Sequence, residues 1–73
     1  MLKLLVMDHT GHSEEAFDPN DIVSLQEAER RFAELTTRGF TAAKIASDGK
    51  NPIIRQFDPT AEEILMIPRL RGG

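Results

Sequence analysis

The sequence predicts an α+β fold in which one helix crosses one face of a mixed sheet, in the order strand, strand, helix, strand, strand, strand. Apolar runs lie near both ends of the chain, at 2–7 and 64–67, and such runs are typical of strands covered on both faces. Between them, residues 19–38 carry apolar side chains at helical spacing. A chain of 73 residues can build only one core. We therefore expect one domain over residues 1–68, followed by a flexible C-terminal tail at 69–73.

The first apolar run predicts a central strand. Because side chains alternate between the two faces of a strand, one face would carry Leu2, Leu4 and Val6, and the other Lys3, Leu5 and Met7. Gly11 can adopt a positive φ, so a turn there would return the chain as a polar edge strand over residues 12–17.

A helix is predicted over residues 19–38. Asp18 is a suitable cap and Pro19 suits the first helical position. Ser24 and Glu27 have capping-box spacing and leave a later start open. The stripe expected to pack on the sheet consists of Ile22, Leu25, Glu29, Phe32 and Leu35. Gly39 can take the left-handed position that ends a helix.

The second half of the chain predicts three strands. Residues 40–46 and 53–57 would be two strands around a turn cluster at 47–52. Residues 61–63 could form one helical turn capped by Asp58 or Thr60. The run at 64–67 would be the last strand, and Pro68 ends it.

This order of elements predicts a β-grasp roll. The two fully apolar strands, one from each end of the chain, are expected side by side in the middle of the sheet. A ferredoxin-like arrangement would need two good helices, and only one segment has helical periodicity for more than a turn.

Composition excludes several classes of function. The chain has no cysteine, which rules out a disulfide framework, a thiolate nucleophile and a cysteine-based zinc site. Its net charge is -3, so the basic patch of a nucleic-acid-binding protein is not expected. The apolar run at the N-terminus breaks at Asp8 and is too short to span a bilayer. We expect a soluble, cytoplasmic monomer without a membrane contact.

The chain ends in Arg69-Leu70-Arg71-Gly72-Gly73. This ending, after a final strand, resembles the ubiquitin-like β-grasp family, whose ubiquitin-type members end in the same five residues. The order of elements and the position of Pro19 after an acidic residue agree with that family.

The resemblance implies that the chain is a substrate and not an enzyme. The Gly73 carboxylate would be adenylated by an activating enzyme that uses Mg and ATP, passed to a cysteine of that enzyme, and joined to a lysine amine of a target protein. A conjugating enzyme and a deconjugating protease would be further partners. Glycines at positions 72 and 73 allow close backbone approach in a narrow channel, and Arg69, Leu70 and Arg71 would contact the activating enzyme. No cofactor is expected on the chain itself.

Two alternatives share the same expected fold. The thiamin and molybdopterin sulfur carriers are similar to this chain at the Gly-Gly end, and such a carrier would form a thiocarboxylate on Gly73. A non-conjugating interaction module would use the sheet surface alone. The resemblance implies an apolar partner-binding patch on the outer face of the sheet, and Leu5, Met7, Ile54 and Met66 are the candidates if they point away from the helix.

Polar residues near the first turn are the remaining candidate site. Asp8, His9, His12 and Glu14 include types that bind metals. Polar side chains are ordinary in turns, however, and those of a hairpin need not converge. We therefore expect no metal site and no intrinsic catalysis.

Overall fold

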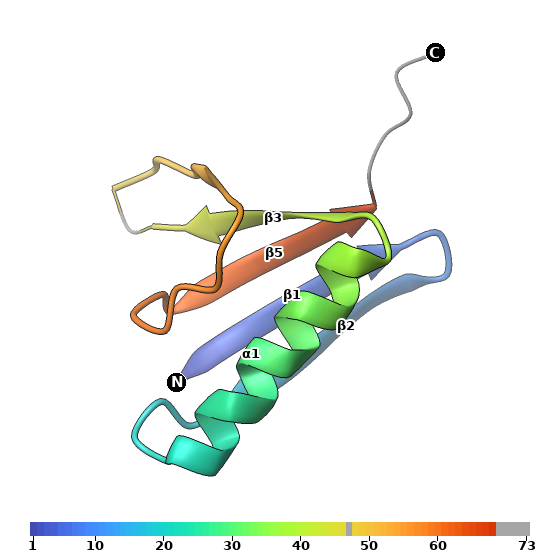
Figure 1. Cartoon of the computed structure of the whole chain (residues 1–73). Helices are drawn as coiled ribbons and strands as arrows, with labels where there is room; N and C mark the ends of the chain where they lie inside the picture. The colour runs from blue at the N-terminus through green and yellow to red at the C-terminus, as the bar shows by residue number, and fades with distance from the viewer. Residues whose placement is uncertain (47, 69–73) are drawn as a thin grey trace.

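The computed structural model describes residues 1–46 and 48–68. Within them the chain forms a small α+β domain with one helix and a mixed five-stranded sheet (Figure 1). The order of strands across the sheet is β2-β1-β5-β3-β4. The elements are β1 (Leu2–Asp8), β2 (Gly11–Phe17), α1 (Ile22–Thr37), β3 (Phe40–Ile45), β4 (Ile53–Ile54) and β5 (Glu63–Pro68).

The strands from the two ends of the chain lie next to each other, as the sequence predicted. β1 and β5 are parallel, with Leu4 opposite Ile64, whereas the other neighbouring strands are antiparallel. Leu4 and Ile64 are both fully buried. The apolar ends of the chain therefore form the centre of the sheet. The expected burial of both strand faces is wrong, because in β1 only the face of Leu2, Leu4 and Val6 is buried.

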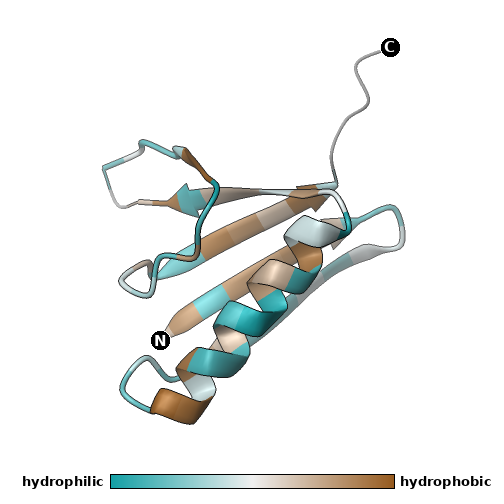
Figure 2. Ribbon diagram, in the orientation of Figure 1, coloured by the Kyte–Doolittle hydropathy of each residue, from teal (hydrophilic) through white to brown (hydrophobic). Residues whose placement is uncertain are grey.

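α1 crosses one face of the sheet, and the core lies between them (Figure 1). Figure 2 shows that β1 and β5 are mostly hydrophobic, whereas the helix has hydrophilic stretches along its length. In β1 the buried side chains are Leu2, Leu4 and Val6, which confirms the predicted alternation. From the helix, Phe32 packs edge-to-face on Phe57, with ring centroids 5.8 Å apart.

The predicted start of the helix at residue 19 is wrong, because the helix begins at Ile22. The carboxylate of Asp21 accepts a hydrogen bond from the Val23 N–H at 3.0 Å and caps the helix. Asp18 instead accepts the Asn20 N–H at 2.9 Å, and its carbonyl accepts the Asp21 N–H at 3.1 Å. A turn over residues 18–21 thus uses the groups that would have started the helix earlier.

The predicted apolar stripe of the helix is only partly correct. Phe32 and Leu35 are buried as expected, but the third buried helix residue is Ala28. Ile22 is 71% exposed. At 3.6 residues per turn, Ile22 lies about 80° around the helix axis from Phe32, away from the side that Ala28 occupies. The small Ala28 side chain, which is fully buried, lets the helix approach the sheet closely.

The end of the helix agrees with the prediction. α1 ends at Thr37, and Gly39 has φ +99°, a backbone conformation that residues with a Cβ rarely adopt. The Gly39 N–H donates to the carbonyl of Thr36 at 3.0 Å.

Two predictions for the segment before β5 are wrong. The expected strand over residues 53–57 stops at Ile54, because the chain bends and brings the ring of Phe57 against the core. The expected helical turn at 61–63 is absent from the described chain, because the Asp58 carboxylate accepts the Thr60 N–H at 2.9 Å and so closes an ordinary turn.

Asp58 also holds this turn to the sheet, since its second carboxylate oxygen lies 2.8 Å from the Lys44 Nζ. The hydrogen bond from Lys44, followed by those from Thr60, lowers the pKa of Asp58 from 3.8 to about 2. A depressed folded-state pKa stabilises the fold above the unfolded-state value. The contribution should therefore be complete above about pH 4 and lost as the pH falls to about 2.

We expect Asp58→Asn to lower the free energy of unfolding at pH 7, because it removes the ion pair with Lys44. The loss should be only about 1 kcal/mol, because the ion pair is part-exposed and screened by solvent. Urea unfolding at pH 7 and pH 2 measures this difference, which should shrink at the lower pH. Glu27→Gln on the exposed side of α1 is the matched control. An equal loss at both pH values would contradict the role of the ionised carboxylate.

Candidate functional site

The predicted conjugation and activating-enzyme residues lie outside the described residues. These are Arg69, Leu70, Arg71, Gly72 and Gly73. The structure does describe Pro68, which ends β5 and stands opposite Phe40 of β3. The last described residue before this segment therefore belongs to a strand in the middle of the sheet.

The predicted partner-binding patch divides between the two faces of the sheet. Leu5 and Met7 lie on the face away from the helix, because they alternate with the buried Leu2, Leu4 and Val6. Leu5 is half-buried and Met7 is 43% exposed. These two residues remain candidates for an outer-face surface.

Met66 and Ile54 do not belong to that surface, which corrects the prediction. Met66 is fully buried and stands opposite Val6 in β1. Ile54 stands opposite the buried Ala42 and packs against the core. Both side chains are on the helix side of the sheet.

Sequence reasoning missed the residues that accompany Leu5 on the outer face. The register places Leu65 opposite Leu5, Ala43 opposite Leu65, and Ile53 opposite Ala43. An apolar row therefore crosses β1, β5, β3 and β4, and Ile53 is 60% exposed. Alternation within the last apolar run is the signal that could have found Leu65, because it separates this residue from its buried neighbours.

The outer face becomes polar at β2. Glu14 stands opposite Leu5, and its carboxylate lies 3.6 Å from the Lys3 Nζ. Both side chains are about half exposed, so this ion pair contributes little to stability. This ion pair lies at the β2 end of the apolar row, so the row is bordered by charged side chains there.

The polar first turn is organised by its own hydrogen bonds. The Thr10 side chain and its N–H, the latter at 2.8 Å, donate to the Asp8 carboxylate and lower its pKa below the ordinary value. Asp8, His9, His12 and Glu14 are all exposed. Within residues 1–46 and 48–68, no three acidic, histidine or cysteine side chains are grouped as a metal site would require.

No protein-family model matches this chain, and comparisons with curated proteins and with solved structures give no match either. In the described part of the chain, no helix is long and apolar enough to cross a membrane.

Proposed function

We propose that the domain is a β-grasp protein modifier of the ubiquitin-like class, joined to other proteins through Gly73. The observation that carries the proposal is the parallel pairing of β1 with β5, across which α1 packs. Residues 69–73 continue the chain directly from this central strand. A short glycine-ended segment attached to a rigid body is suited to entry into an enzyme's channel while the body stays outside.

The proposed chemistry acts on the carboxylate of Gly73 once that residue is the chain terminus. The carboxylate attacks the α-phosphorus of Mg-bound ATP and releases pyrophosphate. A cysteine thiolate of the activating enzyme then displaces AMP, and a lysine amine of the target displaces the thiolate to give an isopeptide. The domain itself supplies no catalytic group, and the requirement for Mg-ATP suits the cytoplasm.

We propose different partners for residues 69–71 and for the outer face of the sheet. Arg69 and Arg71 would pair with carboxylates of the activating enzyme, because a guanidinium makes two parallel hydrogen bonds to a carboxylate. The apolar row of Leu5, Leu65 and Ile53 would be available to a conjugating enzyme or a deconjugating protease. Apolar residues bordered by charge are typical of such contact surfaces.

Peptide mass spectrometry tests the proposal directly. Trypsin cleaves after Arg71, so each modified lysine in a digest of cells that express the chain naturally should retain a Gly-Gly remnant. A cell line lacking the gene is the control, and remnants that depend on the gene are the expected result. Abundant expression beside an activating enzyme, without gene-dependent remnants, would overturn the proposal.

The intact mass of the purified chain distinguishes the sulfur-carrier alternative. A thiocarboxylate replaces one oxygen by sulfur and adds about 16 Da, whereas a conjugated modifier retains an ordinary carboxylate until it reacts. A chain that carries the heavier mass and leaves no lysine remnants would be a sulfur carrier.

A further inference from the structure

β3 has an open edge at its beginning. β4 pairs only with Ala42 and Ala43, whereas β3 starts two residues earlier, at Phe40. The chain bends at Arg55 and leaves the sheet. Phe40 and Thr41 therefore have β5 on one side, and no strand of the described chain on the other.

The hydrogen-bonding groups of Phe40 point toward this open edge. The Lys44 N–H donates to the Pro52 carbonyl at 2.9 Å, on the β4 side of β3. Because the direction of backbone groups alternates along a strand, those of Ala42 and Phe40 face the same way. Opposite Ala42 stands Ile54, but opposite Phe40 the described chain offers no partner. One N–H and one C=O are thus presented in strand geometry.

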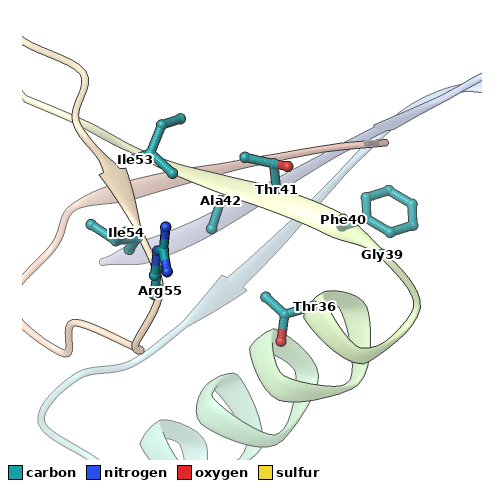
Figure 3. Close-up of a pocket in the computed structure, with 8 residues that line it drawn as sticks. All are labelled: Thr36, Gly39, Phe40, Thr41, Ala42, Ile53, Ile54 and Arg55. Carbon is teal, nitrogen blue, oxygen red and sulfur yellow. The ribbon is translucent and has the colours of Figure 1, made fainter. Parts of the chain in front are cut away.

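A surface hollow of about 460 Å³ lies along this edge (Figure 3). Its walls are the last turn of α1 at Thr36, the start of β3, and β4 with Arg55. The volume is in the range of sites that hold small ligands. Figure 3 shows the Arg55 side chain beside Ile54, extending toward β3.

Arg55 provides the charge of this hollow. It is exposed, and it makes no salt bridge with a carboxylate of the described residues, unlike Arg31 and Lys44. The chain as a whole is acidic, with a net charge of -3. A cation at the wall of a hollow whose lining is otherwise uncharged favours a ligand that carries a carboxylate.

We propose that the open edge of β3 binds an extended, acidic peptide segment of a partner protein. The peptide adds a short strand beside Phe40, in line with the end of β4, and places an aspartate or glutamate side chain against Arg55. An extended backbone is the ligand that offers a donor and an acceptor at strand spacing, and strand addition at open edges is a recurrent mode of peptide recognition. Apolar side chains of the peptide would cover Ile54 from within the hollow.

The probe is the capped pentapeptide acetyl-Val-Glu-Val-Glu-Val-amide, titrated to millimolar concentration into the ¹⁵N-labelled full chain. We expect saturable changes in the amide resonances of Phe40, Thr41, Ala42 and Ile54. The same peptide with glutamine in place of glutamate should bind about fivefold more weakly, which is the effect of one part-exposed ion pair. No saturable change at these residues, or changes confined to β2 or to the outer face, would overturn the proposal.

Two matched sets of variants test the details of binding. Arg55→Gln should weaken binding of the acidic peptide about fivefold and leave binding of the glutamine peptide unchanged. Arg30→Gln, which removes an equal charge from the exposed side of α1, should leave binding of both peptides unchanged. N-methylation at alternate peptide positions should abolish binding for one set of positions only, since only that set faces β3. Equal effects of N-methylation at both sets of peptide positions would exclude strand addition.

Deletion of Gly72 and Gly73 should leave peptide binding intact, so this site and the proposed conjugation can fail separately.

Discussion

Replacing Phe32 by alanine is expected to lower the free energy of unfolding by about 3 to 5 kcal/mol, the usual cost of removing a buried aromatic ring. Phe32 is 3% exposed and is the helix residue whose ring contacts Phe57. Its loss would leave a cavity between α1, the sheet and the segment before β5. Since small domains are marginally stable, this one substitution should remove most of the stability of the fold.

Ile22→Ala is the matched control for this prediction. Both residues belong to the stripe that the sequence assigned to the core, but Ile22 is 71% exposed. Its replacement should change the free energy of unfolding by less than about 0.5 kcal/mol. Urea unfolding followed by far-ultraviolet circular dichroism measures both effects, as the chain has no tryptophan to serve as a fluorescence probe. A large effect at Ile22 would mean that the helix packs through the originally predicted stripe.

The parts of the fold that sequence could predict are those determined by local patterns. The alternation along β1 separates Leu2, Leu4 and Val6 from the residues of the other face, and Gly39 marks the end of the helix. The start of the helix was harder, because Asp18 and Asp21 are chemically equal caps. Only the turn that Asp18 closes with the Asp21 N–H decides between them.

The parts that sequence could not predict depend on tertiary contacts. The sequence predicts a strand over residues 53–57, but the chain bends at Arg55, and the ring of Phe57 packs edge-to-face on Phe32. Nothing in the local pattern indicates this contact between distant residues. The sequence leaves Met66 as a surface candidate, whereas the register with β1 places it opposite the buried Val6. Its neighbour Leu65 lies on the outer face of the sheet, opposite Leu5. Alternation separates Leu65 from Ile64 and Met66, and the pairing with β1 then shows which of the two sets faces outward.

Deleting Gly72 and Gly73 is expected to abolish conjugation. The deletion makes Arg71 the terminal residue, and its Cβ and long side chain would then have to enter the channel in place of a glycine, which permits close backbone approach. The measurement is a denaturing gel of cells that express the chain with an N-terminal epitope tag, in which conjugates run as species heavier than the free chain. We expect these species with the full chain and none with the deleted chain.

Two controls show whether a loss of conjugates comes from the missing glycines or from a folding defect. Arg55→Gln alters the hollow beside β3 but not the terminus, so it should form the same conjugates as the full chain. The deleted chain should unfold at the same urea concentration as the full chain, because the core lies entirely within residues 2–66. Loss of conjugates together with unchanged unfolding would assign the defect to the carboxyl terminus. If partner binding and cellular phenotype survived the deletion, the sheet surface alone would carry the function, and the chain would be a non-conjugating interaction module.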